Sequence, residues 1–253
     1  MFIFDPMKAL LYLLDLLYRF WFYVMIGVVT ILLFPFLFLT TISEKTYPQF
    51  YVVARTWSIL ILLGMGFFPK VKRTKKLDKN RSYVVIANHS SMVDIMMMFW
   101  SVPCPFVFIG KKELAKMPLF GFFYSRSSIL VDRENRQSKK AVFEEAQRRF
   151  KQGSGVCIFP EGGVPKNYAL ALGRFKDGAF RMAIEHELDI LPVILYDNKR
   201  KFPYKAKYGR ACPGRLRARI MPPISTQGMD VHKDKAILRQ QAYDLILEAL
   251  KHK

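Results

Sequence analysis

The pattern of apolar and polar positions divides the chain into two parts. No charged residue occurs from Trp21 to Ser43, a run long enough to cross a hydrocarbon core of about 30 Å. A second uncharged run, from Thr56 to Pro69, is short for a span and suits a re-entrant or interfacial helix at least as well. No small-residue cleavage site follows the first run, which argues against a signal peptide. We therefore expect a membrane-binding or transmembrane segment over residues 1–69.

From about residue 78 short apolar runs alternate with amphipathic stretches. Short β-branched runs predict strands, and amphipathic stretches with a period near 3.6 predict helices. The expected strands are 83–87, 106–109, 128–131, 156–159 and 190–196, with a further one at 216–220. The expected helices are 91–100, 138–151, 175–186 and 233–250. This alternation indicates an α/β domain over residues 70–253, with a mixed sheet flanked by helices. Pro192 lies inside a strand run and indicates a sheet edge or a strand end.

The composition adds a strong positive charge to this picture. Lys and Arg number 40 against 20 Asp and Glu, a formal net charge of +20. Such a surplus suits a polyanionic partner, either nucleic acid or the anionic face of a membrane. The apolar N-terminal part favours the membrane, and the sequence carries no nucleic-acid-binding motif. A membrane scaffold or channel would leave the α/β part without a role.

A basic cluster joins the two parts. Five of the seven residues from Lys70 to Lys76 are Lys or Arg. The positive-inside rule places such a cluster on the cytoplasmic side, where it would attract anionic headgroups. The alternative interpretation is a solvated linker.

The three cysteines, Cys104, Cys157 and Cys212, are odd in number and match no metal-site spacing. Cys157 lies within an apolar run and is expected to be a small core residue. We therefore expect a reduced, cytosol-facing domain with no metal and no redox cofactor.

The segment Asn88-His89-Ser90-Ser91-Met92-Val93-Asp94 lies where a predicted strand ends and a helix begins. A histidine there can act as a general base, and a carboxylate can fix its tautomer. On a regular helix His89 and Asp94 would not share a face. With His89 in the preceding turn and Asp94 in the first helical turn, the carboxylate can fold back to the imidazole, and Ser90 or Ser91 can cap the helix. The alternative is a surface histidine beside an ordinary helix-start Asp.

Two further segments follow predicted strands. Glycines in Phe159-Pro160-Glu161-Gly162-Gly163 let the backbone approach a ligand, and Glu161 could hydrogen-bond substrate hydroxyls. Arg133, after Asp132, could hold a phosphate in bidentate fashion. Taken singly, these could equally be a glycine turn with a solvated Glu and an ordinary surface Arg.

The order and spacing of these segments carry more information than any one of them. The sequence runs from Asn-His-x4-Asp through Lys111, Pro118, Gly121 and Asp132-Arg133 to Phe-Pro-Glu-Gly and Leu-Pro-Val. Over roughly residues 80–200 this order resembles the glycerolipid acyltransferase family, in particular its bacterial 1-acylglycerol-3-phosphate acyltransferase branch.

The resemblance implies specific roles. His89 would be the general base and Asp94 the residue that orients it, while Glu161 and Gly162 would help bind the acceptor. Arg133 would hold the acceptor phosphate, and Lys111 and Lys176 are further expected substrate-binding residues.

The resemblance also implies a reaction, a fold and a location. The reaction would move a fatty acyl group from acyl-CoA or acyl carrier protein to the sn-2 hydroxyl of a lysophospholipid, without a cofactor. The fold would be an α/β domain behind an N-terminal two-helix membrane motif, which can lie in one leaflet. We expect the inner (cytoplasmic) membrane, with the catalytic domain facing the cytoplasm.

One departure affects the expected acceptor. The family usually continues Thr-Arg-Ser after the Glu-Gly, whereas this chain continues Gly163-Val164-Pro165. Lys166, Arg174 or Lys176 could replace the missing charge. Alternatively, the acceptor is another lyso-lipid, such as a lyso-aminolipid.

Overall fold

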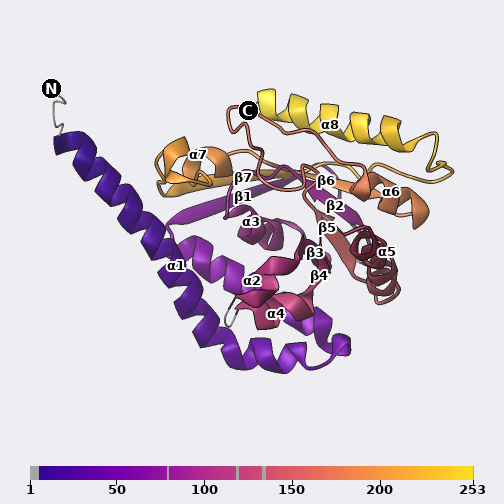
Figure 1. The fold of residues 1–253 in the computed structure, drawn as a ribbon, viewed down its shortest axis with the longest axis horizontal. Helices are drawn as coiled ribbons and strands as arrows, with labels where there is room; N and C mark the ends of the chain where they lie inside the picture. The colour runs from indigo at the N-terminus through magenta and orange to yellow at the C-terminus, as the bar shows by residue number, and fades with distance from the viewer. Residues whose placement is uncertain (1–5, 79, 118–119, 133–134, 253) are drawn as a thin grey trace.

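A single mixed sheet of seven strands forms the centre of the protein (Figure 1). The computed structural model describes residues 6–78, 80–117, 120–132 and 135–252. The sheet has the order β1-β7-β6-β2-β5-β3-β4, and every neighbouring pair is parallel except β6 and β7. The strands are β1 Phe67–Arg73, β2 Val84–Ala87, β3 Phe106–Lys111, β4 Ser128–Val131, β5 Gly155–Ile158, β6 Ile190–Leu195 and β7 Gly214–Ile220. The predicted α/β class is confirmed.

Helices cover both faces of the sheet. Figure 1 shows α8 above the sheet near α6, and α1, α2 and α4 below it. The helices are α1 Pro6–Thr41, α2 Tyr47–Gly64, α3 Asp94–Ser101, α4 Phe120–Ser127, α5 Arg136–Lys151, α6 Gly178–Glu185, α7 Asn198–Lys201 and α8 Lys235–Lys251, and short 3-10 helices are η1 Glu44–Thr46, η2 Lys112–Lys116 and η3 Ala206–Tyr208. Because both faces are covered, β2 and β6 are buried at every position, as expected for central strands of an α/β sheet.

The long apolar helix α1 runs along one side of the domain. Its buried residues Asp15, Phe22 and Val29 fall seven residues apart and form a stripe that faces the domain. The other sides of α1 expose large apolar residues, such as Phe20 and Ile31. Among the described residues, α1 is the one helix that is long and apolar enough to cross a membrane.

The second apolar run of the sequence divides into two elements. Its first half belongs to α2, whose Tyr51 hydroxyl donates to the Val102 carbonyl at 2.9 Å. Its last residues begin β1, which pairs in parallel with β7. Sequence analysis missed β1, and the expected boundary at residues 69 and 70 falls inside this strand. Lys70, Lys72 and Arg73 are therefore strand residues rather than part of a linker.

Pro192 does not mark a sheet edge, contrary to one of the two expectations. β6 is interior, between β2 and β7. Pro192 precedes the ladder with β7, which begins at Val193 on the β6 side. The Pro192 carbonyl accepts from Met221 N–H at 3.0 Å, so the backbone polar groups of Pro192 face the β7 side, beyond the end of that strand. The missing N–H therefore removes no bond of the ladder that β6 forms with β2 or with β7.

A close approach between β5 and the start of β2 gives a stability prediction. A Cβ added at Gly155 would lie 2.5 Å from the Tyr83 carbonyl oxygen, a backbone atom that cannot move independently. Gly155→Ala is expected to lower the free energy of unfolding by about 1–3 kcal/mol through overpacking. Thermal unfolding of the detergent-solubilised protein measures the effect.

The matched control is Gly178→Ala at the start of α6, where an added Cβ meets nothing within 4 Å. An unchanged or higher Tm is expected for this control. Equal Tm values for the two variants would contradict the close-approach argument.

Candidate active site

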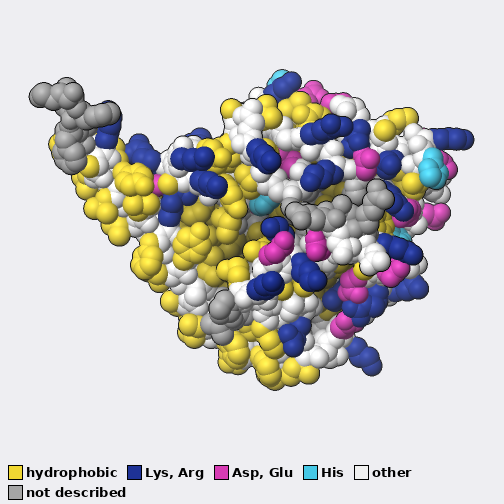
Figure 2. All heavy atoms as spheres, in the orientation of Figure 1, with side chains coloured by type: hydrophobic (Ala, Val, Ile, Leu, Met, Phe, Trp, Pro, Cys, Tyr) yellow, Lys and Arg dark blue, Asp and Glu magenta, His cyan; other side chains and the backbone are white. Residues whose placement is uncertain are grey.

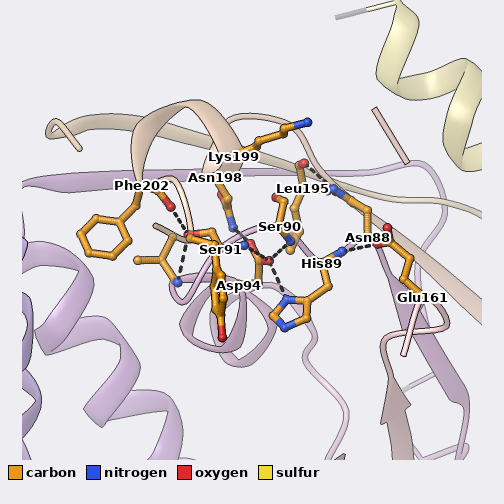
Figure 3. Close-up of polar contacts among 12 residues, drawn as sticks. Asn88, His89, Ser90, Ser91, Asp94, Glu161, Leu195, Asn198, Lys199 and Phe202 are labelled. Carbon is orange, nitrogen blue, oxygen red and sulfur yellow. Dashed lines mark hydrogen bonds and ion pairs between the residues drawn. The ribbon is translucent and has the colours of Figure 1, made fainter. Parts of the chain in front are cut away.

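The predicted site residues gather at the carboxyl ends of the central parallel strands. Asn88 and His89 directly follow β2, Glu161 follows β5, and Asn198 follows β6. Figure 3 shows His89, Asp94, Asn198 and Glu161 converging on one region. This is the edge at which open α/β sheets bind ligands.

The expected contact between His89 and Asp94 is present. The distance between His89 Nδ1 and Asp94 Oδ2 is 2.9 Å. Residues 91–93 form a turn and α3 begins only at Asp94, so the carboxylate folds back to the ring. A hydrogen bond from Nδ1 to a carboxylate requires the proton on Nδ1 and leaves Nε2 as the proton acceptor. The ring also stacks on Phe159, with centroids 4.1 Å apart. His89 is thus oriented as a general base.

Asp94 is fully buried, and four donors hold its carboxylate. Besides the imidazole, Oδ2 accepts from the backbone N–H groups of Ser90 at 2.6 Å and Ser91 at 2.8 Å. Oδ1 accepts from the side-chain amide of Asn198 at 2.7 Å. Buried carboxylates are costly unless hydrogen bonds compensate them, and here these donors do so. The network fixes Asp94 in one rotamer.

Neither serine of the motif is the N-cap residue of α3, which is Val93. The Ser91 hydroxyl instead donates to the Phe202 carbonyl at 2.5 Å and accepts from Val93 N–H at 3.3 Å. Ser90 is buried, and its carbonyl accepts from the Tyr168 hydroxyl at 2.8 Å. Both serines therefore connect the histidine turn to neighbouring loops.

Glu161 ties two loops together. Its Oε1 accepts from His89 N–H at 2.7 Å, and its Oε2 accepts from Gly173 N–H at 2.6 Å. Burial raises the pKa of Glu161 above its ordinary value, and the hydrogen bonds from these two N–H groups offset part of that rise. Both carboxylate oxygens of Glu161 thus accept hydrogen bonds from the backbone, and Glu161 supports the turn that carries His89.

Asn88, the first residue after β2, joins that strand to Leu195, the last residue of β6. Its side-chain amide donates to the Leu195 carbonyl at 2.9 Å and accepts from Leu195 N–H at 2.8 Å. These bonds fix the position of His89 relative to Asn198, which lies three residues beyond Leu195 along the chain.

A cavity of about 630 Å³ opens next to Glu161. Its lining includes the cations Lys166, Arg174 and Lys176. A much smaller cleft beside His89 has Glu161, Pro165 and Leu170 in common with it. The cavity therefore adjoins the cleft that His89 lines. Its cationic side could accommodate an anionic group.

Comparison with known proteins identifies the family. The profile of the family described as Acyltransferase matches residues 69–196. The chain belongs to this acyltransferase family. It is 29% identical over 84% of its length to 1-acyl-sn-glycerol-3-phosphate acyltransferase of Saccharomyces cerevisiae, 70% of which is covered. It is 30% identical over 70% of its length to the Haemophilus influenzae enzyme of the same name, 72% of which is covered.

Other similarities cover less of the relative or show the fold alone. The chain is 30% identical to the alpha form of the mouse enzyme over 65% of its own length, but spans only 57% of that relative. The crystal structure of the 1-acyl-sn-glycerophosphate acyltransferase of Thermotoga maritima superposes with a TM-score of 0.77. That alignment covers 95% of this chain and 96% of the other at 21% identity, so it shows a common fold.

Of the other residues expected to bind substrate, Lys176 lines the cavity and Lys111 does not. Arg133 lies outside the described residues. Lys111 ends β3, pairs with Glu113 at 3.4 Å, and lines neither the cavity nor the cleft. Lys176 lines the cavity and lies against Gly162, where an added Cβ would be 2.6 Å from its Nζ. Gly162 has a φ of +75°, which favours glycine.

Sequence analysis missed Asn198 and Tyr168. Asn198 contacts Asp94, and Tyr168 contacts Ser90. The rule that sites lie at the carboxyl ends of strands points to the neighbourhood of Asn198, three residues after β6. No comparable signal marks Tyr168, which belongs to a loop.

The geometry at His89 predicts the effect of Asp94→Asn. The amide cannot stabilise an imidazolium and favours the wrong tautomer, which in a serine-protease triad lowers kcat by about 10⁴. We expect a loss of roughly three to four orders of magnitude in kcat for acyl transfer, on the same physical grounds.

Asp244→Asn is the control, because Asp244 is an exposed residue of α8 that accepts from Gln240. Its kcat is expected to equal that of the wild type. Near-normal turnover of folded Asp94→Asn protein would refute the orienting role.

Proposed function

We propose that this acyltransferase moves a fatty acyl group from acyl-CoA or acyl carrier protein to the sn-2 hydroxyl of 1-acylglycerol-3-phosphate, giving phosphatidic acid. The observation that carries the proposal is a cationic cavity beside an oriented histidine base. The names of the yeast and Haemophilus relatives support the same acceptor. The reaction needs no cofactor beyond the acyl donor.

The chemistry follows from the free nitrogen of His89. Its Nε2 removes the proton of the acceptor hydroxyl as the oxygen attacks the thioester carbonyl. The C–O bond forms and a tetrahedral oxyanion results. Collapse of this intermediate breaks the C–S bond, and the imidazolium gives its proton to the departing thiolate. Asp94 stabilises the imidazolium between the two proton transfers.

Transfer in one displacement fits the nearby nucleophiles, since the Ser90 hydroxyl oxygen beside His89 is buried from solvent. The Ser91 hydroxyl is engaged with the Phe202 carbonyl. Cys157 is fully buried, and burial raises the pKa of its thiol well above the ordinary value, which keeps it unreactive. A covalent acyl-enzyme is therefore not part of the proposal.

The cations of the cavity support a phosphate-bearing acceptor. The chain lacks the Arg that the family usually has after its Glu-Gly, and Gly163-Val164-Pro165 stand there instead. Lys166, Arg174 and Lys176 are exposed at the cavity, and among the described residues none of them forms an ion pair. Charge-assisted hydrogen bonds from such side chains are the usual means of holding phosphate.

Membrane association supports delivery of the acceptor. The contacts of α1 with the domain extend from Asp15, which accepts from Ala211 N–H, to Phe38, which stacks on Phe122. At 1.5 Å per residue, these contacts cover roughly 34 Å of the helix. A helix attached over that length would draw the domain into a hydrocarbon core of about 30 Å if it spanned the bilayer. We therefore propose that α1 lies in one leaflet of the inner membrane, with the catalytic domain on the cytoplasmic side.

The exposed side of α1 suits such an arrangement. Figure 2 shows apolar surface along this helix, whereas many Lys and Arg side chains are spread over the rest of that face among Asp, Glu and other residues. Apolar residues would enter the acyl region, and basic ones would meet anionic headgroups. The acceptor can then reach the site with its own chain still in lipid.

A second acceptor class remains a candidate because of the missing Arg. A lyso-aminolipid carries an acylatable hydroxyl without a phosphate, so His89 could deprotonate it in the same way. The two candidates differ in their need for the cations of the cavity.

Acyl transfer by purified, detergent-solubilised protein tests the function. Labelled acyl-CoA and acyl carrier protein are each offered with lysophosphatidic acid and with a lyso-aminolipid, using wild type and His89→Ala. We expect label in phosphatidic acid with the wild type only. Label in the aminolipid product alone would refute the proposed acceptor, and no transfer to either would refute the proposed reaction.

The cavity gives a separate prediction. Arg174→Gln and Lys176→Gln should each raise KM for lysophosphatidic acid roughly tenfold or more, because each removes a charged hydrogen bond to phosphate. kcat should change little. Lys151→Gln, at the exposed end of α5, is the control and should leave KM unchanged. Unaltered KM in both cavity variants would place the phosphate elsewhere.

A further inference from the structure

An ion pair lies within the largely apolar first half of α1. Arg19 Nε is 2.9 Å from Asp15 Oδ2, and only 4% of Asp15 is exposed. Charged groups removed from water are costly unless they are paired and hydrogen-bonded. Asp15 lies on the stripe of α1 that faces the domain and not on its exposed apolar side, so membrane attachment does not explain the pair.

The remaining donors and acceptors of the pair are directed at one loop of the α/β domain, residues 202–213 between α7 and β7. Asp15 Oδ1 accepts from Ala211 N–H at 2.5 Å. Arg19 donates to the Pro203 carbonyl at 2.8 Å and to the Gly209 carbonyl at 2.9 Å. The pair thus holds both ends of this loop against α1.

The same loop begins at the active site. The Phe202 carbonyl accepts from the Ser91 hydroxyl, and Phe202 N–H donates to the Asn198 carbonyl at 2.8 Å. The Asn198 side chain in turn donates to Asp94. Figure 3 shows Ser91 bonded to Phe202, and Asn198 bonded to Asp94 beside them. A continuous set of bonds therefore joins α1 to the carboxylate that orients His89.

Ring packing and a second bond reinforce the connection. The Phe202 ring lies 4.7 Å from that of Phe22 and 5.3 Å from the Arg19 guanidinium. Tyr204 N–H donates to the Tyr168 hydroxyl at 3.2 Å, and that hydroxyl donates to Ser90. The loop is therefore tied to the histidine turn at Ser90 as well as at Ser91.

We propose that Asp15 and Arg19 of the membrane helix are positioning residues for acyl transfer, and that they act through the 202–213 loop and Asn198 on Asp94. The inference rests on the proposed function only in taking Asp94 as the partner of the catalytic base. α1 then sets the geometry of the site in addition to contacting lipid.

Steady-state kinetics in detergent micelles measure the effect apart from membrane attachment. Arg19→Ala, Asp15→Ala and Asn198→Ala are each expected to lower kcat roughly 10- to 100-fold, the cost of misplacing a catalytic group by about 1 Å. KM for either substrate should change less than about twofold, since none of these residues lines the 630 Å³ cavity. Asp15→Asn should lose activity to an intermediate degree, because its amide oxygen can accept from Ala211 N–H but its NH₂ group then faces the Arg19 Nε–H donor.

Thr30→Ala is the matched control. Thr30 is also on α1 and accepts from Trp57 Nε1 at 2.9 Å, but its partner lies on α2, away from the loop. This variant should keep wild-type kcat. An equal loss in Thr30→Ala and Arg19→Ala would overturn the proposal, because any weakening of α1 would then have the same effect.

A double-mutant cycle tests the route. If Arg19 acts through Asn198, the variant with both changes to Ala should lose no more kcat than the worse single change, within about twofold. Measured as kcat/KM, Arg19→Ala combined with Arg174→Gln should instead show additive free-energy effects, because the first change lowers kcat and the second raises KM. Additive losses for Arg19 and Asn198 would overturn the route.

Hydrogen exchange followed by mass spectrometry gives a readout independent of turnover. The amides of Ser90 and Ser91 are protected by Asp94, and that of Ala211 by Asp15. Arg19→Ala should accelerate exchange in peptides covering residues 88–94 and 202–213, and Thr30→Ala should not. Unchanged exchange at 88–94 would overturn the coupling even if the wild type proved inactive on every lyso-lipid. Faster exchange with absent wild-type turnover would instead refute the proposed function alone.

Discussion

The hydrogen bonding of one buried carboxylate, that of Asp94, determines how the site is built. Water reaches neither oxygen, so each must be compensated by protein donors. Those donors come from the turn after β2 and from Asn198 after β6. Asn88 holds these two strand ends together through Leu195. The orientation of His89 therefore depends on the alignment of two strands that are adjacent in the sheet.

The sequence predicted the part of this site whose residues are close together along the chain. His89 and Asp94 belong to one short segment, and a turn before a helix is enough to bring them together. Asn198 could not be assigned because it meets Asp94 only through the pairing of β2 with β6, which a strand pattern alone does not specify. Glu161 was expected to help bind the acceptor; it lines the cavity, and its carboxylate accepts from the backbone N–H groups of His89 and Gly173.

In the fold too, strands with a clear local sequence pattern were predicted, and the strand that depends on a distant partner was missed. Buried strands such as β2 and β6 are short apolar runs, and their pattern predicted them. β1 was missed because Phe67 continues an apolar run and its later residues are basic, so the pattern resembled a membrane segment followed by a linker. Its strand conformation depends on pairing with β7, near the other end of the chain. The pattern of apolar and polar residues in such a short edge strand does not show which other strand it pairs with.

The pairing of β1 with β7 has a consequence for biosynthesis. Among the described strands β1 leaves the ribosome first, yet its partner residues, Gly214 to Ile220 of β7, are synthesised much later. Contacts so distant in sequence slow folding and leave strand edges exposed while they wait. During that interval α1 can already associate with lipid, which would keep the nascent chain at the bilayer. The basic side chains of β1 disfavour pairing with other chains until β7 arrives.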